Sequence, residues 1–427
     1  MKNKSIISIF FIFIIISSFA QDKEYAISCV KTLASPEFHG RGFVKKGDQK
    51  ASQFIADELK KWQCLNFNNS YFQNFVFDIN TLSKAKISVN NKTLRLGIDF
   101  LAYSASSSIK GQYNLYYPKD FSINQFKKEN HSEDIFILDT IHYKSKALIK
   151  NYRNIIRTCA FHNAKAIVEI TSQALIQTQS TYELNYAYLQ IKKEAWDSTA
   201  EQIHLNIKNK FKKKYSTRNV IGYIEGEVDS FYVFTAHYDH LGQIGKQVYF
   251  PGANDNASGV ATILNLAKYY QEQNIKPHYS IAFILFTAEE AGLIGSLYYT
   301  KHPLFPLAKI KFLFNLDMVG TGEEGLSVVN GKKQDKASLL LKKINTNHAY
   351  FDDIRIGKGS ANSDHYFFDK AGVPTVFLFT RGGPQFYHDI YDRSQTLPMT
   401  KLKELSKLLI QFTEQYNILN PKPFSVE

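Results

Sequence analysis

Beyond its first 21 residues, the spacing of apolar and polar positions divides the chain into stretches typical of helices and stretches typical of strands. From Asp22 to Cys64, apolar residues recur at helical intervals in KEYAISCVKTLA and again in Gln49–Trp62, with the break SPEFHGRG between them. From about Phe75 to Tyr215, short alternating runs such as AKISVNNKTLRL, GQYNLYY and DIFILD are typical of strands. We therefore expect a helical segment followed by a separate β-rich module.

From Asn219 onward, predicted strands and helices alternate. The strand-like runs are NVIGYIEG, SFYVFTAH, SIAFILFTA, IKFLFNLDMV and VPTVFLF, and helical patterns such as Asn256–Gln273, Ser338–Asn347 and Lys401–Tyr416 lie between or after them. This order predicts an α/β fold with a mostly parallel sheet sandwiched by helices. Ligands bind to such sheets at the carboxyl ends of the strands.

Composition narrows the class of protein. The chain has 427 residues, of which 44% are apolar and 21% charged, so disorder and coiled coil are excluded. The net charge of +13 raises the question of nucleic acid, but the basic residues are dispersed, and we expect no such partner. The one dense cluster, Lys208–Lys214, is interpreted as a solvated loop. The three cysteines (Cys29, Cys64 and Cys159) are too few for a disulfide scaffold and lack metal-ligand spacing, so at most one disulfide is expected.

Residues 1–20 have the pattern of a secretory signal peptide. Two lysines precede the apolar run Ile6–Ile16, and Ser18 and Ala20 place small residues before a cleavage point at Gln21. The run is shorter than the roughly 20 apolar residues of a bilayer span. We therefore expect export to the periplasm or the medium, with no stable membrane insertion after cleavage.

Polar side chains that suit a metal site follow the predicted strands. His237 and Asp239 follow SFYVFTA, and an imidazole beside a carboxylate is typical of a ligand with an orienting partner. Glu289 and Glu290 leave an apolar strand side by side, which is costly near a buried site unless a cation compensates. One of these two acids can bind metal while the other accepts a proton. The candidate ligands come from five loops: His237, Asp255, Glu290, Asp317 and His388.

Taken alone, each candidate has a structural alternative. Asp255 stands before a helix, where an N-cap aspartate is common, Glu289 and Glu290 could be exposed loop acids, and Asp317 could be a turn residue. Together, five mixed ligands are too many for one four-coordinate ion and suit two ions that share a carboxylate. Zinc is the favoured metal, with cobalt or manganese as alternatives. Such two-metal sites hydrolyse peptide or phosphate bonds.

The motifs AHYDHLG, GANDNASGV, FTAEEAGLIGS, NLDMVG and YHD, in this order, resemble the M28 family of zinc metallopeptidases, the bacterial aminopeptidase type. LASPEFHGRG, STRNVIGYIEG and SANSDHYFFDKAGVPTVFL extend the resemblance over about Lys31–Cys64 and Asn219–Leu409. It implies a zinc-aminopeptidase (phosphorylase/hydrolase-like) catalytic domain formed by residues 21–74 and 216–427. Residues 75–215, called the insert below, resemble a protease-associated domain through FHNAKAIVEI.

The resemblance also implies roles for single residues. It assigns two zinc ions per chain to the five candidate ligands, with His237 and Asp317 on one ion, Glu290 and His388 on the other, and Asp255 bridging both. Asp239 would orient His237, Glu289 would be the general base, and Tyr387 would polarise the scissile carbonyl. A cis peptide bond is expected between Asp255 and Asn256.

The function implied is an exported di-zinc exopeptidase that removes N-terminal residues from peptides through a metal-bridged water and a glutamate base. One alternative is a glutaminyl cyclase of the same fold, which uses one zinc and would not require His237 and Asp317. Another is a non-catalytic peptide-binding relative. The last ligand motif reads YHDIYDRSQT where the family usually has YHTPDD. The loop beside the substrate pocket therefore differs, and the substrate preference, like the oligomeric state, is left open.

Overall fold

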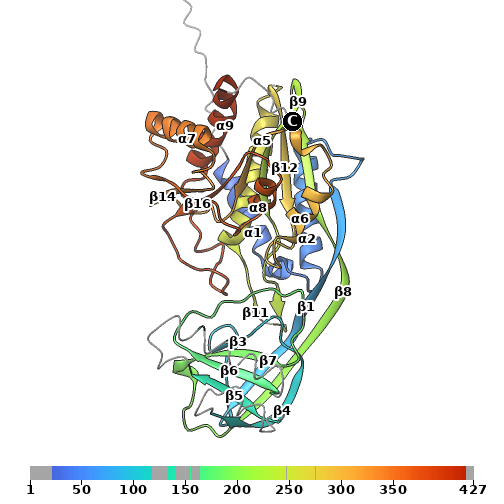
Figure 1. Cartoon of the computed structure of the whole chain (residues 1–427), viewed down its shortest axis with the longest axis vertical. Coiled ribbons are helices and arrows are strands. Elements are labelled where there is room, and N and C mark those ends of the chain that lie inside the picture. Colours follow the sequence, from blue (N-terminus) through green and yellow to red (C-terminus); the bar gives the residue numbers. More distant parts are fainter. Residues whose placement is uncertain are drawn as a thin grey trace, which may run out of the picture.

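The computed structural model describes residues 22–117, 133–139, 150, 154, 164–246, 248–274 and 276–419. The predicted signal peptide and Cys159 lie outside these residues. Figure 1 shows two bodies, one above the other, joined by two long paired strands. These strands, which run antiparallel, are β1 (Phe72–Val89) and β8 (Gln202–Ile224). The predicted domain boundaries at 75 and 215 fall inside β1 and β8, and the division into domains stays a prediction.

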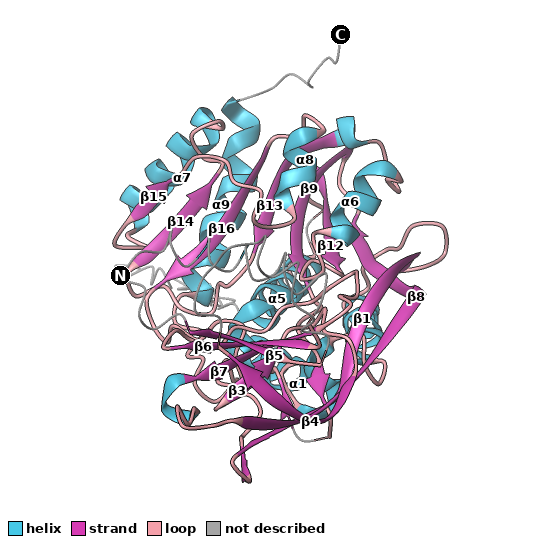
Figure 2. Cartoon of the chain, turned by 60° about the horizontal axis from the view of Figure 1, so that its bottom comes forward, coloured by secondary structure: helices cyan, strands magenta, loops and turns pink. Residues whose placement is uncertain are grey.

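The upper body is built on a mixed sheet with a parallel centre (Figure 2). Its central strands are parallel to one another in the spatial order β16 (Thr375–Arg381), β13 (Ile310–Leu316), β9 (Val228–His237) and β12 (Tyr279–Phe286). On one side β14 (Gly325–Val329) and β15 (Ile354–Ile356) extend the sheet, and on the other β8 pairs antiparallel with β12. Every residue of β13 is buried. The predicted α/β sheet, mostly parallel at its centre, is confirmed.

Helices cover both faces of this sheet because its strands are apolar on both faces. Along β12, Ile281, Phe283 and Leu285 pack into one apolar core, and the alternate residues pack into another. The first core is lined by α1 (Lys23–Leu33), α2 (Gly47–Lys61), α5 (Ser258–Glu272), α7 (Asp335–His348) and α9 (Leu402–Leu419). The second is lined by α6 (Ile294–Lys301) and α8 (His365–Lys370). Short helical turns are η1 (Pro36–Arg41), η2 (Lys193–Ala195), η3 (Ala253–Ala257) and η4 (Leu307–Lys309).

The lower body contains the strands of the insert and has an apolar core of its own. Its strands follow the outer half of β8 in the order β4 (Ile109–Tyr116), β5 (Ile135–Asp139), β6 (Ala166–Thr171), β7 (Ala187–Lys192) and β3 (Phe100–Ala102). The strands β4, β5, β6 and β7 are parallel to one another, whereas β4 is antiparallel to β8 and β3 is antiparallel to β7. Smaller pieces are β2 (Lys92–Thr93), β10 (Gln243–Ile244) and β11 (Val248–Tyr249). The insert is β-rich, as predicted.

The interpretation of Lys208–Lys214 as a loop is wrong. This run lies within β8, where Lys208 pairs with Lys84, and Lys212 pairs with Ile79 on β1. Its lysines are exposed or half-buried on the ribbon between the two bodies. The backbone pairing over many residues decides the conformation here, and the local charge only decides which side chains face water.

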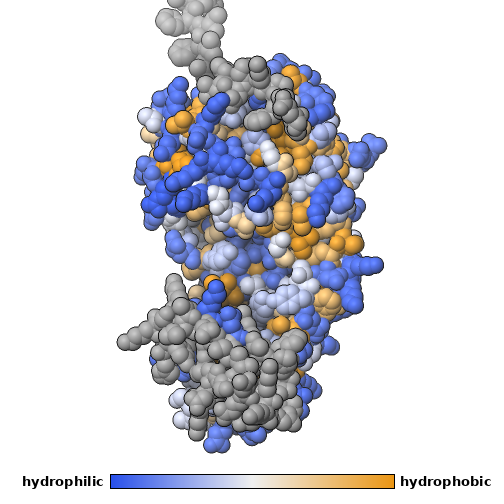
Figure 3. Space-filling view, in the orientation of Figure 1, coloured by the Kyte–Doolittle hydropathy of each residue, from blue (hydrophilic) through white to orange (hydrophobic). Residues whose placement is uncertain are grey.

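Cys29 and Cys64 are free, buried thiols in the core between the first helices and the sheet. Burial raises the pKa of each thiol to about 12. Within the described residues, no helix combines the length and the apolar character needed to cross a bilayer. Figure 3 shows apolar surface on the flank of the upper body where Figure 1 draws β12 and α6. Apolar atoms form much of any folded surface, so this area carries no functional assignment.

Candidate active site

The predicted site residues converge at the carboxyl ends of the central strands. His237 is the last residue of β9, Asp317 follows β13 directly, and Glu289 and Glu290 follow β12. Because β13, β9 and β12 are adjacent and parallel, their ends meet at one edge of the sheet. Asp255 lies in η3 before α5, and His388 follows β16, so these two approach the same edge from loops.

One half of the cluster is centred on His237, which is 1% exposed. Its Nε2 lies 3.3 Å from Oδ1 of Asp255, 3.4 Å from Oδ1 of Asp317 and 4.0 Å from Oε2 of Glu289. The other oxygen of Asp317 accepts a hydrogen bond of 2.8 Å from the hydroxyl of Ser363. That bond fixes the carboxylate from behind and leaves Oδ1 directed at the imidazole.

The other half is centred on His388. Its Nε2 lies 3.1 Å from Oδ2 of Asp255 and 3.1 Å from Oε2 of Glu290. Asp255 therefore faces His237 with one carboxylate oxygen and His388 with the other. The five predicted ligands are thus brought together, with Asp255 in the middle.

Hydrogen bonding at the far side of each ring shows that this donor set suits cations. Nδ1 of His237 bonds the main-chain oxygen of Asp239 at 3.1 Å, and Nδ1 of His388 bonds that of Gln177 at 3.0 Å. A carbonyl oxygen only accepts, so Nδ1 carries the hydrogen in each ring. In the neutral ring, Nε2 then directs an unshared pair at carboxylate oxygens. This arrangement is repulsive unless the ring is protonated or a cation lies between, and imidazole with carboxylate is a zinc donor set.

The pKa values of the predicted ligands reflect the many carboxylates in the cluster. Burial alone would lower the pKa of His388, but the charge of Glu290 and the hydrogen bonds to Asp255 and Glu290 raise it to about 11. Burial would raise the pKa of Asp255, yet its hydrogen bonds to His237 and His388 hold it well below the usual range. The cluster therefore stabilises positive charge at the two ring nitrogens.

The adjacent glutamates differ in their protonation. Burial raises the pKa of Glu289 well above its usual value, with the charge of His237 opposing this shift and the charges of Glu290 and Asp317 adding to it. For Glu290, the effect of burial is overcome by His388 and by hydrogen bonds from His240 and His388, so its pKa falls to about 2. Groups whose environments push their pKa values apart suit different roles, one as a proton carrier and one as a permanent anion.

Asp239 and Tyr387 lie beside the cluster. The carboxylate of Asp239 is 3.8 Å from Nδ1 of His237, so the ring's hydrogen bond goes to the main chain of Asp239 instead. The Asp239 carboxylate accepts the main-chain N–H of Glu289 at 3.1 Å. Tyr387 is 46% exposed, and its ring stacks on that of His388 with centroids 3.8 Å apart. Burial of the phenol and the charges of Asp255 and Glu290 raise its pKa.

Two further residues hold the loop of Asp255. Arg41 is fully buried and donates to five main-chain oxygens, those of Leu33, Tyr238, Pro251, Gly252 and Asp255. Asp392 accepts the main-chain N–H groups of Asn254 and Asp255 at 2.8 and 3.0 Å. The expected cis peptide bond between Asp255 and Asn256 is present. Sequence reasoning gave no role to Arg41 or Asp392, although Arg41 lies in the quoted motif LASPEFHGRG.

His240 and Asp364 were also missed. Nδ1 of His240 lies 2.7 Å from Oε1 of Glu290, and its Nε2 has no hydrogen-bond partner within the described residues. Gly252 packs against this ring so closely that a Cβ there would lie 2.4 Å from Cδ2 of His240. Asp364, directly before α8, is buried, and burial raises its pKa to about 7. Both residues stand in quoted motifs, HYDH and SANSDHYF, but only His240 is close in sequence to a predicted ligand, so no sequence signal pointed to Asp364.

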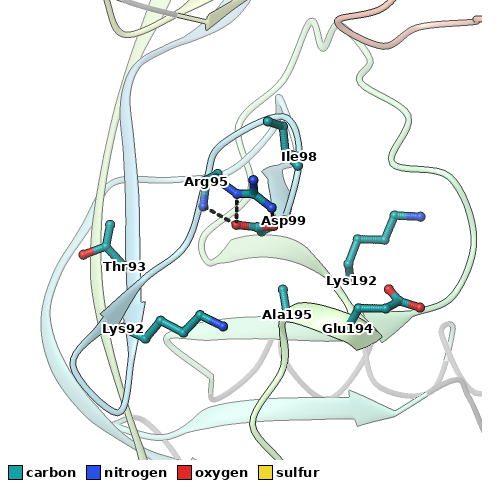
Figure 4. A pocket seen from close by; sticks show the side chains of 8 residues that line it. All are labelled: Lys92, Thr93, Arg95, Ile98, Asp99, Lys192, Glu194 and Ala195. Carbon is teal, nitrogen blue, oxygen red and sulfur yellow. Dashed lines mark hydrogen bonds and ion pairs between the residues drawn. The ribbon is translucent and has the colours of Figure 1, made fainter.

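The hollow in Figure 4 lies on the insert, away from these residues. It has a volume of about 500 Å³ and is lined by eight residues, among them Lys92, Lys192 and Glu194. Arg95 and Asp99 lie next to each other on one side of it, with a hydrogen bond of 2.8 Å between Nη2 and Oδ1. None of the predicted site residues lines this hollow, so we assign it no role in the site.

Part of the chain matches a known peptidase family. Residues 219–413 match the model of peptidase family M28. Aminopeptidase YwaD of Bacillus subtilis is 29% identical over 263 residues, which are 58% of this chain and 54% of that protein. The chain spans about half the length of the curated relatives it matches.

Among solved structures, a peptidase M28 precursor from Shewanella amazonensis superposes with a TM-score of 0.71 at 17% identity, covering 96% of each chain. A zinc aminopeptidase from Bacillus subtilis superposes with a TM-score of 0.68 at 22% identity, covering 92% of this chain and 94% of that one. At these identities the superpositions show a common fold.

Proposed function

We propose that this chain, which belongs to peptidase family M28 through its residues 219–413, is an exported aminopeptidase that holds two zinc ions. The observation that carries the proposal is the position of Asp255, whose two carboxylate oxygens face the Nε2 atoms of His237 and His388 at 3.3 and 3.1 Å. One carboxylate shared between two imidazoles, each with a further carboxylate beside it, is the donor set expected of two neighbouring zinc ions.

The two zinc positions would draw on different parts of the chain. His237 and Asp317 would hold one ion and His388 and Glu290 the other, with Asp255 shared between them. When bound, zinc supplies a Lewis acid that polarises the scissile carbonyl and acidifies water. The carboxylates that would hold the ions are positioned by neighbours, since Ser363 bonds Asp317 and His240 bonds Glu290. Such outer hydrogen bonds orient ligands and raise their affinity for metal.

Glu289 is the proposed general base. Its main-chain N–H is bonded to Asp239, and its Oε2 lies 4.0 Å from Nε2 of His237, which places the carboxylate beside the first metal position. Glu289 would take a proton from the attacking water on a carboxylate oxygen and pass it to the nitrogen of the leaving amine. Glu290 makes its contacts with His240 and His388, so it remains a ligand and an anion.

Tyr387 is the proposed hydrogen-bond donor to the substrate. Its ring lies flat against His388, and its phenol keeps its proton because burial and nearby carboxylates raise the pKa. A neutral phenol can donate to the scissile carbonyl oxygen as negative charge develops there. The half-exposed side chain is accessible to a peptide that enters from solvent.

Export rests on the pattern of residues 1–20, with their lysines, apolar run and small residues before Gln21. Expression of the full chain in a bacterium, followed by N-terminal sequencing of protein from the periplasm and the medium, tests this part. A mature protein that begins at Gln21 supports it. Protein that retains Met1 and stays in the cytoplasm contradicts it.

The activity is tested with a panel of short peptides followed by mass spectrometry. The panel contains free and N-acetylated peptides, includes leucyl peptides because several relatives are named leucine aminopeptidases, and is run with and without a chelator. Release of the first residue from free peptides alone, abolished by the chelator and restored by zinc, is the expected result. Loss of ammonia from an N-terminal glutamine without cleavage would identify a cyclase instead. No turnover of any peptide by the zinc-loaded protein would contradict the proposal.

A further inference from the structure

The insert contacts the candidate site through its main chain. The N–H of Gln177 donates to the main-chain oxygen of His388 at 3.0 Å, and Nδ1 of His388 donates back to the main-chain oxygen of Gln177 at 3.0 Å. Gln177 is 3% exposed and lies between β6 and β7 of the insert. We call residues 175–180 the contact loop. This pair of bonds fixes both the backbone and the ring orientation of His388.

A second contact ties the contact loop to the other side of Glu290. The side-chain Nε2 of Gln179 donates to the main-chain oxygen of His240. His240 in turn bonds Glu290, which lies 3.1 Å from His388. Both histidines that approach Glu290 are therefore held by the same loop of the insert.

The loop of His388 is also anchored in the insert by an apolar side chain. Ile390 packs against the apolar core of the insert, together with Val248. A Cβ on Gly97 of the insert would lie 3.1 Å from Cγ2 of Ile390, so the isoleucine rests directly on that glycine. Ile390 follows His388 by two residues on the same loop. Its contact with Gly97 therefore anchors the loop that carries His388 to the insert.

Among the described residues, the hydrogen bonds that hold the side chains of His237 and Asp317 come from outside the insert. His237 is bonded by Asp239, and Asp317 by Ser363, and all of these residues belong to the upper body. His388 instead lies on a loop after β16, and the acceptor for its ring N–H comes from the insert. The two halves of the site thus depend on the insert to different degrees.

We propose that the insert is a positioning element for the second metal position, formed by His388 and Glu290. The contact loop and the seat of Ile390 hold His388 in the orientation in which its Nε2 faces Asp255 and Glu290. This inference rests on the proposed function only in taking His388 as a zinc ligand. Outer partners of metal ligands are worth about 10–100-fold in metal affinity, and we expect the contacts with the insert to lie in that range.

The test is a zinc titration of the metal-free protein by calorimetry. Ile390→Ala removes the apolar anchor, and we expect it to weaken one of two zinc-binding steps about 10-fold or more and to leave the other unchanged. Ile390→Val should restore most of the affinity. Ile176→Ala is the matched control, because Ile176 lies on the contact loop but is 45% exposed, and it should change neither step.

A background variant assigns the affected step. His388→Ala should abolish one step, and adding Ile390→Ala to it should have no further effect on the step that remains. If Ile390→Ala does not fold, Gln179→Leu, which removes the bond to His240, should weaken the same step selectively. Equal weakening of both steps, or no change in either variant, would overturn the proposal.

Because the readout is zinc affinity, failure of the inference is distinguishable from failure of the proposed activity. A wild-type protein that binds two zinc ions and cleaves no peptide would contradict the activity alone. A wild-type protein that cleaves peptides, with both zinc steps indifferent to Ile390 and Gln179, would contradict the positioning role alone.

Discussion

The two proposed metal positions of this site are built from different parts of the molecule. His237 is the last residue of β9, and Asp317 follows β13, so their backbones are fixed by buried strands in the centre of the sheet. His388 lies on a loop, and its orientation is set by Gln177 from the insert. The first pair of proposed ligands thus stands at the ends of packed strands, whereas in the second pair His388 contacts a segment 211 residues away in the sequence.

The difference shows how one part of such a site can depend on a contact with the insert. Strand ends are rigid because every neighbour of the strand is packed, and they tolerate changes elsewhere. A ligand on a loop has to be held by something else, and here the insert supplies both hydrogen bonds and an apolar seat for Ile390.

The largest effect is expected at the residue that both positions share. Asp255→Asn should release both zinc ions, because a neutral amide is a poor ligand for a dication. The loss of several kcal/mol of transition-state stabilisation corresponds to a fall of roughly 10³-fold or more in kcat/KM. Metal analysis and peptide hydrolysis measure both consequences. Asp335→Asn, an exposed aspartate at the start of α7, is the control and should behave as wild type. Retention of two zinc ions by Asp255→Asn would contradict the proposal that this residue binds both of them.

Variants of the two adjacent glutamates distinguish a role in proton transfer from a role in metal binding. Glu289→Gln should lower kcat about 10²–10⁴-fold with zinc content retained, as expected of a general base. Glu290→Gln should weaken the zinc ion at His388 and leave the ion at His237 in place. Both variants should stay folded, because neither residue belongs to the apolar strand β12. Loss of zinc from Glu289→Gln with full retention by Glu290→Gln would reverse the two assignments.

Replacement of Arg41 tests whether the buried guanidinium that bonds the loop of Asp255 stabilises the fold. Arg41→Met leaves five main-chain oxygens without their donor. Because an unsatisfied buried acceptor costs about 1–3 kcal/mol, we expect the free energy of unfolding to fall by about 3 kcal/mol or more. Denaturant unfolding of metal-free protein measures it. Arg218→Met is the control, since Arg218 is only partly buried and bonds Ser52 and Gln49. An equal loss in the two variants would argue against a special role for Arg41.

The smallest effect is expected at the junction where β8 passes from the insert to the upper body. Asp48 on α2 accepts hydrogen bonds from Tyr215 and Thr217 of β8, and burial raises its pKa to about 6. At pH 5 the folded protein keeps this proton while the unfolded chain has lost it. The contribution of Asp48 to stability therefore falls as the pH rises from about 4 to about 6 and is constant above that.

Asp48→Asn should remove this pH dependence. The pKa of Asp48 rises on folding by about two units, which corresponds to about 3 kcal/mol. The free energy of unfolding of the variant, measured relative to that of the wild type, should therefore rise by up to that amount between pH 4 and pH 7. Unfolding free energies measured across this range give the difference. If the difference between variant and wild type stays constant with pH, the Asp48 carboxyl titrates alike in the folded and unfolded chain.

Much of the fold could be predicted because the strands and helices carry strong periodicity. The runs that became β9, β12 and β13 are mostly apolar, and the five candidate ligands stand at the end of a predicted strand, on the loop after one, or before α5. Parallel strands bring their carboxyl ends together, so residues distant in sequence could be assigned to one site. The assignment of single roles came from the resemblance and stays a proposal.

What could not be predicted depends on contacts that leave no trace in the side-chain pattern. The bonds between Gln177 and His388 run through main-chain atoms, which every residue possesses. Arg41 reaches carbonyl oxygens up to 214 residues away. The lysines of β8 were assigned to a loop because local charge concealed a pairing with β1 that is set at long range.

The central claim is that two cations share Asp255, one beside His237 and one beside His388. Anomalous diffraction from crystals grown with zinc, measured at the zinc absorption edge, tests it most directly. The account predicts two peaks, each in contact with one oxygen of Asp255, with Glu289 coordinating neither. A single peak, or a peak held by His240 in place of His388, would contradict it.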